Sequence, residues 1–514
     1  MLCWPCLLAL ALAATAQRAP IRPLRWHFNP PTWTNDPSLL YTPATGLFHN
    51  FFQAPQSATP YAPWAPQGGG PVWRHATTPD FSAFTDHGPI NLTKNEGTGS
   101  LAMVNATYAV RAFAGLGGTS IGGAADAQAA AWVDLPPFPR VPPPPPSAPA
   151  VNAFSGDPFL YYDEQFSEWV LLVAACNGGT DWRSCVTPRL RKYAAADVVA
   201  GAFAPIAEAY FTGPEGGTRP ECPRAWRFSP QLALLAWSSP PLGRSLWFLG
   251  SATRAAFTSA ASGLLDGGAF YAATLSPVPS APRSFTGEAA LLVGWVHDAR
   301  PVDPAVPWYN TMSAPRYLRA AQDGLRVQQA PAPLLLQQRG ALLWGGNVTG
   351  RGGAGNFSLL PPGASGASLW VEAQLVAWHA SCAPAAAAAA AAVGPSSWGL
   401  ALLASPDAQE ATLLSIANGT ALIADSTRGS LDPAMGKAVY TAAASPASPG
   451  LRAVTALVDV SLVEAFAHSD IEGEAVVSIR SYPTRLDSGR VAVLASPPSG
   501  AQGFCVSVWV YTMP

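Results

Sequence analysis

Short apolar segments bounded by turn-forming residues recur along the whole chain, whereas the periodicity of amphipathic helices is hard to find. Segments of this kind, rich in branched and aromatic side chains, are typical of β-strands, because such side chains pack well on a pleated surface. We expect strands at residues 47–53, 159–163, 169–175, 245–251 and 290–296. The pattern therefore predicts an all-β fold.

The pattern changes in character near residue 335. Segments 368–378, 451–469 and 503–512 alternate between apolar and polar residues, as expected for a sandwich of two sheets. A stretch rich in Gln, Pro and Leu at about 326–340 separates the two parts, and we expect it to be a linker. No strict repeat of about 40 to 50 residues is visible, so periodicity alone does not predict a β-propeller in the first part.

The composition supports an all-β class and narrows the function. Of 514 residues, 49% are hydrophobic and only 12% are charged, against roughly a quarter in typical soluble domains, so the chain buries a large core. The 53 prolines and 46 glycines interrupt long helices and favour short strands joined by turns. Lys and Arg number 29 against 31 Asp and Glu, which leaves no basic surplus for binding phosphate backbones. We therefore expect no nucleic-acid partner.

Residues 1–16 predict a cleavable secretory signal peptide. An apolar run from Cys6 to Ala14 is followed by Ala14-Thr15-Ala16, the small-residue pattern that signal peptidase accepts. The run is shorter than the ~20 residues of a membrane span, so a retained anchor is the less favoured alternative. We expect a secreted protein, extracellular or vacuolar, with no membrane association after cleavage.

The remaining cysteines and the glycosylation sequons fit that compartment. Cys176 and Cys185 flank a turn-rich segment and could form a local disulfide, and Cys382 could pair with Cys505 at long range. Cys222 would then be a free thiol. Both pairings are hypotheses, because connectivity is not readable from sequence. Five N-glycosylation sequons begin at Asn91, Asn105, Asn347, Asn356 and Asn418.

Three carboxylates stand out in a chain so poor in charge, namely Asp36, Asp157 and Glu221. Each is followed by a proline within two positions and has aromatic residues nearby. Because desolvation near apolar surface moves a carboxyl pKa toward a catalytic value, these residues point to a carboxylate-dependent enzyme. The alternative is that an Asp-Pro pair only starts a turn, as it would at Asp303 and Asp432.

The segment from Trp26 to Gln53, WHFNPPTWTNDPSLLYTPATGLFHNFFQ, resembles the opening signature of the invertase and fructanase family of glycoside hydrolases, family 32. Further motifs similar to those of the family follow in its order, at 73–76 with Asp80, 98–100, 156–158 and 221–223. Weaker similarities occur at 270–272, 294–296, 314–316 and 463–466. The resemblance spans nearly the whole mature chain, and the order of five individually weak motifs carries it.

The resemblance implies a five-bladed β-propeller over residues 17–330, followed by a β-sandwich over residues 331–514. It also implies that Asp36 is the nucleophile, Glu221 the general acid/base, and Asp157 a transition-state stabiliser that binds fructose hydroxyls. A retaining glycosidase needs such a division, because one carboxylate attacks the anomeric carbon while an acid protonates the leaving oxygen.

The same resemblance places sugar contacts at five further positions, which are Trp33, Asn35, Gln53, Trp73 and Thr98. Amides form paired hydrogen bonds with hydroxyls, and indoles offer an apolar face to the sugar. With 18 tryptophans in the chain, Trp73 could equally be a core residue. We expect no metal and no cofactor, since the histidines show no ligand spacing.

The chain departs from the family's motifs at four places. They are Ser38-Leu39 in place of Asn-Gly, Arg74 in place of Gly, Gly156 in place of Arg, and Arg224 in place of an acidic residue. The lost arginine matters most, because a guanidinium beside Asp157 would fix the geometry of that carboxylate. Arg74, Arg219 or Arg224 could compensate for it in space.

Together these features predict a secreted β-fructofuranosidase, similar to invertase, that hydrolyses sucrose or related fructosides by retaining double displacement through a fructosyl-Asp36 intermediate. A fructan hydrolase or fructosyltransferase of the same family would share the first half-reaction. A catalytically silent carbohydrate-binding or enzyme-regulating relative is the alternative from another class. Gly156 and the altered Ser38-Leu39 motivate it, while retention of all three carboxylates argues against it, because a binding protein has no need of an acid/base glutamate. An enzyme with a similar propeller but arabinose or xylose specificity is more distant. In each case the partner is a small carbohydrate.

Overall fold

A computed structural model describes the chain from residue 22 to residue 514. The stretches left out are 31–33, 55–71, 91–95, 106, 116–117, 125–131, 135–155, 178–184, 201–202, 215–219, 241, 281–283, 302–305, 307, 352–355, 380–381, 383–395, 445–449, 470–472, 500 and 502. The predicted signal peptide at 1–16 and the sequon at Asn91 lie outside the described residues. Within the described residues the fold is nearly all-β, and the one helix there is the short α2 (Pro333–Leu336). No helix in this part of the chain is long and apolar enough to cross a membrane.

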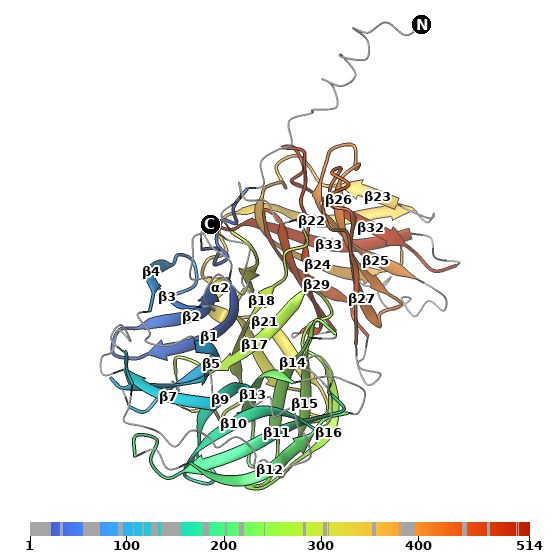
Figure 1. The fold of residues 1–514 in the computed structure, drawn as a ribbon. Helices are drawn as coiled ribbons and strands as arrows, with labels where there is room; N and C mark the ends of the chain where they lie inside the picture. Colours follow the sequence, from blue (N-terminus) through green and yellow to red (C-terminus); the bar gives the residue numbers. More distant parts are fainter. Residues whose placement is uncertain are drawn as a thin grey trace, which may run out of the picture.

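Four antiparallel sheets of four strands each follow one another along the chain (Figure 1). The first holds β1 (Asn35–Thr42), β2 (Leu47–Ala54), β3 (Val72–Thr78) and β4 (Thr85–Pro89). The second holds β5 (Glu96–Met103), β6 (Ala109–Gly115), β7 (Gly118–Ala124) and β8 (Trp132–Asp134). The third holds β9 (Gly156–Asp163), β10 (Glu168–Asn177), β11 (Thr187–Ala195) and β12 (Ala204–Thr212). The fourth holds β13 (Glu221–Arg227), β14 (Ala233–Ser239), β15 (Arg244–Ala252) and β16 (Phe257–Leu264).

A fifth set of four strands has the same antiparallel order and continues into a larger sheet. It holds β17 (Phe270–Ser276), β18 (Ala290–Val296), β20 (Arg316–Ala320) and β21 (Val327–Pro331), with β19 (Thr311–Met312) paired to β18. A single register pair, Gln329 with Gly473, joins β21 to the strands that follow.

The last third of the chain forms two packed sheets. One consists of β31 (Gly473–Arg480), β30 (Leu462–His468), β29 (Ala453–Asp459), β24 (Ser368–Ala377), β33 (Gly503–Thr512) and β22 (Leu342–Arg351). The other consists of β23 (Asn356–Leu359), β32 (Arg490–Ser496), β25 (Ser397–Ala404), β26 (Ala411–Ala417), β27 (Ala421–Arg428) and β28 (Val439–Ala443). Buried side chains from both sheets share one hydrophobic cluster, which includes Val371, Leu400, Val463 and Val493. The alternating pattern of this part therefore packs as a two-layer sandwich.

The strands predicted from short apolar segments are confirmed, since the five segments fall within β2, β9, β10, β15 and β18. The linker predicted at 326–340 is wrong in its first half. Val327 to Pro331 form β21, in which Val327 and Gln329 are buried and Gln329 Nε2 donates to the carbonyl of Leu265. The polar residues of this segment suggested a linker, but the Gln329 side chain forms its hydrogen bond within the protein and the segment is a strand.

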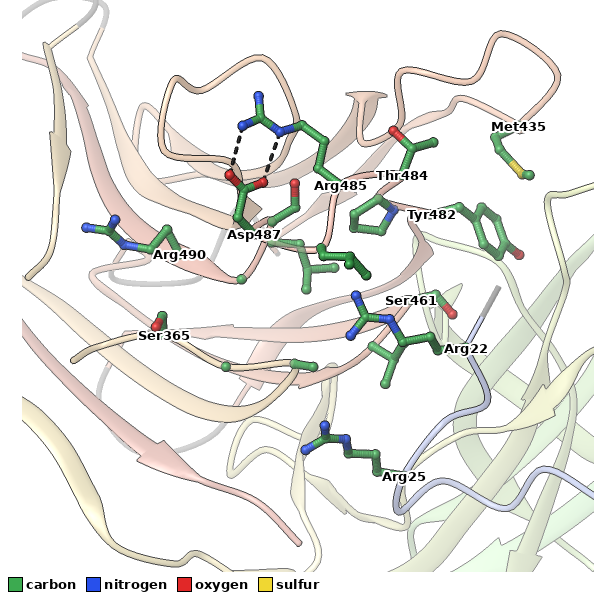
Figure 2. Close-up of a pocket in the computed structure, with 18 of the residues that line it drawn as sticks. Arg22, Arg25, Ser365, Met435, Ser461, Tyr482, Thr484, Arg485, Asp487 and Arg490 are labelled. Carbon is green, nitrogen blue, oxygen red and sulfur yellow. Dashed lines mark hydrogen bonds and ion pairs between the residues drawn. The ribbon is translucent and has the colours of Figure 1, made fainter. Parts of the chain in front are cut away.

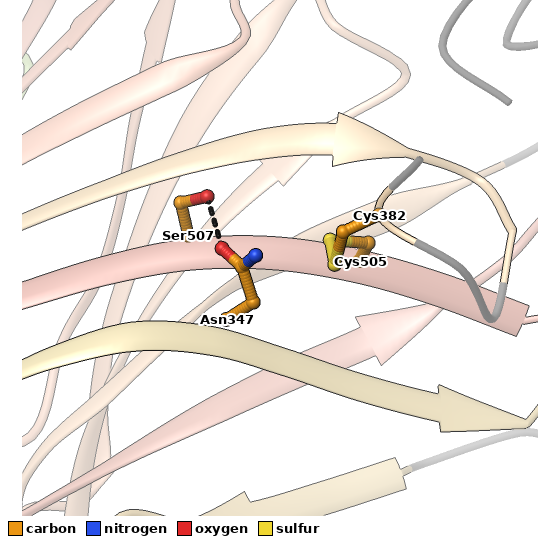
Figure 3. Close-up of a disulfide and its surroundings, with 4 residues drawn as sticks. All are labelled: Asn347, Cys382, Cys505 and Ser507. Atoms are coloured by element: carbon orange, nitrogen blue, oxygen red, sulfur yellow. Dashed lines mark hydrogen bonds between the residues drawn. A yellow bond between two sulfur atoms is a disulfide. The ribbon is translucent and has the colours of Figure 1, made fainter. Parts of the chain in front are cut away.

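Both predicted disulfides are present. Cys176 is bonded to Cys185, Cys382 is bonded to Cys505, and Cys222 is a buried free thiol. Cys505 lies in β33, beside the Ser507 hydroxyl that donates to Asn347 on the neighbouring strand β22 (Figure 3). The second disulfide ties Cys382 to β33, which lies between β24 and the edge strand β22.

The first strands of the five sheets share one irregularity. In each, a β-bulge gives the first strand one more residue than its partner. The bulges lie between Asn35 and Ser38, Glu96 and Gly99, Gly156 and Phe159, Glu221 and Arg224, and Tyr271 and Thr274. These strands are also neighbours in space: β1 contacts β5 and β17, β9 contacts β5 and β13, and β13 contacts β17. Because a bulge bends its strand and re-aims side chains, this arrangement gathers the redirected residues.

Candidate active site

All three predicted carboxylates lie at these bulges: Asp36 and Asp157 within them, and Glu221 directly before one. Asp36 and Asp157 are each the second residue of their strand, with φ of 41° and 51°, and Glu221 is the first residue of β13, followed by Cys222 with φ of 49°. Positive φ is unfavourable for residues with a Cβ and persists where surrounding structure imposes it. The shared backbone conformation points side chains from separate sheets toward one place.

A hydrogen-bonded chain orients the Asp36 carboxylate. The Thr98 hydroxyl donates to Asp36 Oδ2 over 2.5 Å, and Gln53 Nε2 donates to Thr98 Oγ1 over 2.9 Å. Thr98 and Gln53 are 6% and 2% exposed, whereas Asp36 is only half-buried. Oδ2 of Asp36 is therefore held by the protein, and the partly exposed carboxylate remains accessible to a ligand.

Burial, and then the nearby Asp157 carboxylate, raise the pKa of Asp36 to about 6. The Thr98 hydroxyl and the charge of Arg224 act in the opposite direction. Like charges placed close together in a desolvated site disfavour ionisation, whereas hydrogen-bond donors and cations favour it. Asp36 is thus an ionised carboxylate above about pH 6.

The other two carboxylates are connected through β13. The Cys222 amide donates to Asp157 Oδ2 over 3.0 Å, and the Tyr271 hydroxyl donates to Glu221 Oε2 over 2.9 Å. Burial, and then Glu221, raise the pKa of Tyr271, so the phenol stays a donor at every physiological pH. Three carboxylates from β1, β9 and β13 therefore form one group, each with a protein donor.

The positions predicted to contact sugar fall into three groups. Asn35 and Gln53 are opposite each other in the β1–β2 register, and Asn310 Nδ2 donates to Asn35 Oδ1 over 3.0 Å. Thr98 lies against Asp36, as described above. Trp73 is 2% exposed and packs in a hydrophobic cluster with residues of β1, β2, β5 and β6, and Trp33 lies outside the described residues.

Of the three arginines considered as substitutes for the lost motif arginine, Arg224 is the one buried at the carboxylates. Arg74 forms an ion pair with Asp86 at 2.7 Å on the outer strands of the first sheet, and Arg219 lies outside the described residues. Arg224 is fully buried, and its charge acts on both Asp36 and Asp157. A guanidinium is therefore retained at the site, on β13 and not beside Gly156.

Three residues that were not predicted from the sequence also lie at the site, namely Tyr271, Trp295 and Asn310. Tyr271 and Trp295 lie in short segments that resemble the family only weakly, and they face each other across the bulge of β17. Asn310 has φ of 60°, a conformation that asparagine tolerates better than most residues. The weak similarity to the family at 270–272 was the available signal for Tyr271.

A separate cavity of about 980 Å³ lies between the start of the described chain and the sandwich (Figure 2). Arg22 and Arg25 line one side, and Arg485 and Asp487, joined by an ion pair at 2.8 Å, line another. None of its lining residues belongs to the carboxylate group. The described residues also contain no cluster of three or more His, Cys, Asp or Glu side chains suited to a metal ion.

The geometry defines the class of protein. The nearly all-β fold brings three carboxylates together. Two of them are partly exposed: Asp36, which the Thr98 hydroxyl orients, and Glu221, which the Tyr271 phenol holds. These are the groups that glycoside hydrolysis requires. The protein is a glycoside hydrolase. It belongs to glycoside hydrolase family 32, because the model of the family's N-terminal domain matches residues 27–331 and that of its C-terminal domain matches residues 355–509.

Solved structures with the same fold share little sequence with this chain. A fructan 1-exohydrolase IIa of Cichorium intybus is 17% identical with a TM-score of 0.71, covering 96% of this chain and 97% of that one. An exo-inulinase of Aspergillus awamori is 19% identical with a TM-score of 0.70, covering 96% and 98%. A family 32 β-fructofuranosidase of Bombyx mori is 16% identical with a TM-score of 0.67, covering 99% and 97%. No curated protein sequence matches the chain.

Proposed function

We propose that the protein is a secreted β-fructofuranosidase that cleaves sucrose or a related fructoside with retention of configuration. The observation that carries the proposal is the Gln53–Thr98–Asp36 chain of hydrogen bonds, which orients one carboxylate beside two others. A binding protein has no need of an oriented nucleophile, whereas a double displacement requires one.

In the first half-reaction, an oxygen of ionised Asp36 attacks C2 of the fructosyl unit. The bond from C2 to the leaving oxygen breaks, and the proton of Glu221 passes to that oxygen. Asp157, held by the Cys222 amide, accepts hydrogen bonds from fructose hydroxyls that strengthen as positive charge builds on the ring. The products of this step are a fructosyl-Asp36 ester and a released aglycone, which is glucose when sucrose is the substrate.

In the second half-reaction, Glu221 accepts a proton from water, and the resulting hydroxide attacks C2. The Asp36 carboxylate leaves, so fructose is released and both carboxyls return to their starting states. An acceptor sugar in place of water would make the same site a fructosyltransferase. Tyr271 holds Glu221 through both steps by the hydrogen bond to Oε2.

The wider architecture supports this function. We propose that the five sheets are blades of a β-propeller over residues 17–330, because their first strands contact one another in sequence and β1 contacts β17. The sandwich occupies residues 331–514. Blades around an axis place loops and strand ends at a central funnel, which is where the bulges of the first strands gather.

Secretion is supported by features outside the site. Two disulfides form where the sequence allows them, which suits an oxidising compartment. The sequon residues Asn105, Asn347 and Asn418 are exposed, as N-glycosylation requires. We propose that residues 1–16 are removed and that the mature glycoprotein is extracellular or vacuolar.

The solved relatives supply candidate substrates. Structures are named for a fructan 1-exohydrolase with 1-kestose and for a Bombyx mori β-fructofuranosidase variant with sucrose. The test is release of reducing sugar from sucrose, inulin and levan by the purified mature chain. Glu221→Gln should lower the rate by about 10²- to 10⁴-fold, whereas Glu208→Gln, which changes an exposed carboxylate on β12, should leave it unchanged.

If the wild-type protein cleaves none of the three, hydrolysis is contradicted. Binding of the same sugars without turnover would then identify a catalytically silent relative. Turnover by Glu221→Gln at the wild-type rate would contradict the assignment of the acid/base even if the substrate assignment holds.

A further inference from the structure

Arg224 is a buried residue of β13 whose charge interacts with the carboxylate group. It is the first residue after the β13 bulge, and its neighbours at the same place on the adjacent strands are Phe159 of β9 and Thr274 of β17. Its Cζ lies 5.3 Å from the centroid of the Phe159 ring, and its Nε donates to Thr274 Oγ1 over 3.3 Å. The guanidinium therefore lies across three inner strands, directly behind the bulges that carry the site.

The charge of Arg224 is buried without an ion pair. The side chain is 0% exposed, and no carboxylate of the described residues lies within ion-pair distance of it. Nη1 donates to the Pro223 carbonyl over 2.8 Å, while Nη2 has no hydrogen-bond partner among the described residues. A buried guanidinium is costly unless negative charge compensates it.

That negative charge is supplied by the carboxylate group. Asp36 and Asp157 are the acidic residues whose charges act on Arg224. The titratable groups that face Asp36 are Asp157 from β9, Glu221 and Cys222 from β13, and Tyr271 from β17. Burial raises the pKa of Cys222 and of Tyr271, so both stay neutral near pH 7. Among the described residues, Arg224 is a cation whose charge acts on Asp36 and Asp157.

We propose that Arg224 is the buried counter-charge of the active site, a positioning residue that keeps Asp36 and Asp157 ionised together. It acts through space and the bulged strand and does not touch substrate, since it is fully buried. The cation stands on β13, the strand that also carries Glu221. The inference rests on the proposed function in one respect, which is that Asp36 must be ionised in order to attack.

The first test is the pH dependence of kcat/KM in wild type, Arg224→Met and Arg224→Lys. Loss of the cation makes ionisation of Asp36 less favourable, so Arg224→Met should move the acid limb upward by about one pH unit or more. On the acid side this is about a tenfold loss of kcat/KM beyond any loss at the optimum. Arg224→Lys keeps the charge and should move the limb by less than about a third as much.

Arg227→Met is the matched control, because Arg227 is a buried arginine of the same strand that pairs with Asp163 at 3.3 Å. It should leave the acid limb in place. An Arg224→Met profile that superimposes on the wild-type profile after scaling would show that Arg224 only packs against Phe159 and Thr274, and would overturn the proposal.

A second test needs no turnover. Arg224→Met removes a positive charge that acts on Asp36 and Asp157, and Asp157→Asn removes one of these two negative charges while keeping an oxygen for the Cys222 amide. In a double-mutant cycle of thermal unfolding at pH 7, Asp157→Asn should recover at least about a third of the Tm lost by Arg224→Met. Additive changes would overturn the proposal. If the wild-type protein releases no fructose, the proposed function is contradicted, but the role of Arg224 is not. The double-mutant cycle then still tests whether Arg224 compensates the two carboxylates.

Discussion

The backbone amide of Cys222 donates to Oδ2 of Asp157 over 3.0 Å, and this bond joins the strand that carries Glu221, the proposed acid/base, to the carboxylate that we propose binds fructose hydroxyls. Cys222 has positive φ and follows Glu221 directly, so the bulge that turns its amide toward Asp157 also sets the direction of Glu221. The two carboxylates are therefore positioned by one backbone feature.

Asp157 should respond differently to two substitutions. Asp157→Asn keeps an acceptor for the Cys222 amide, whereas Asp157→Ala leaves that buried amide unpaired, at a cost of about 1 to 3 kcal/mol. Both variants should lose most activity, but only Asp157→Ala should also lower Tm, by several degrees. Equal Tm values for the two variants would contradict the role of the hydrogen bond.

Thr98 should affect the nucleophile through its hydroxyl. Because a hydrogen bond to the ionised form lowers a carboxyl pKa, Thr98→Val should raise the pKa of Asp36 and move the acid limb of kcat/KM to higher pH. We expect kcat to fall by roughly tenfold, and Thr98→Ser to restore most of it. A Thr98→Ser variant as impaired as Thr98→Val would indicate that the methyl group, and not the hydroxyl, is required.

The ionised Asp36 carboxylate should lower the free energy of unfolding at neutral pH. Its folded pKa of about 6 exceeds the usual value of 3.8, so the folded state binds this proton more tightly than the unfolded state does. The destabilisation is present above pH 6 and vanishes below about pH 4. Asp36→Asn should therefore raise the free energy of unfolding at pH 7 by on the order of 2 to 3 kcal/mol, with no gain at pH 4. Denaturant unfolding at the two pH values checks this, and an equal gain at both would contradict it.

The contacts of His27 with the sandwich strands should make the thermal stability of the protein depend on pH. Its Nδ1 lies 3.0 Å from Asp459 and its Nε2 lies 2.8 Å from Glu464, both on sandwich strands, and Glu464 also pairs with Arg316 of β20. Burial lowers the pKa of His27, but the two carboxylates outweigh it and raise that pKa above its usual value. The stabilisation is thus complete below about pH 6.5 and is lost as the pH rises through the folded pKa.

The wild-type Tm should accordingly fall on the alkaline side, and His27→Gln should remove this dependence while costing about 3 kcal/mol near pH 6. Scanning calorimetry from pH 6 to pH 9 measures both effects. A His27→Gln variant with the wild-type pH dependence would show that other groups cause the alkaline loss.

Much of the fold follows from local sequence. Apolar segments such as 290–296 are strands because their side chains are buried on both faces, as in β18, and the spacing of Cys176 and Cys185 around a turn allowed their bond. The carboxylates were found because prolines and aromatics surround them. Each of these signals lies within about ten residues of the feature that it predicts.

The contacts that complete the site could not be predicted in the same way. Thr98 was predicted as a sugar contact, and the structure adds that its hydroxyl donates to Asp36, which lies in another sheet. Tyr271 reaches Glu221 from a different strand, and Arg224 faces inward only because the bulge shifts the register of β13. Such contacts depend on how separate sheets are arranged, and the bulges recur at intervals too irregular to appear as a sequence repeat.

The most direct test of the account is to trap the covalent intermediate. Glu221→Gln should react with β-fructofuranosyl fluoride, because fluoride leaves without a proton, and should then hydrolyse the ester slowly because no base activates water. Peptide mass spectrometry of the quenched protein should find one fructosyl unit on the peptide that contains Asp36, and none after the additional change Asp36→Asn. Rapid fructose release with no adduct, or an adduct on a peptide without Asp36, would contradict the assignment of Asp36 as the nucleophile.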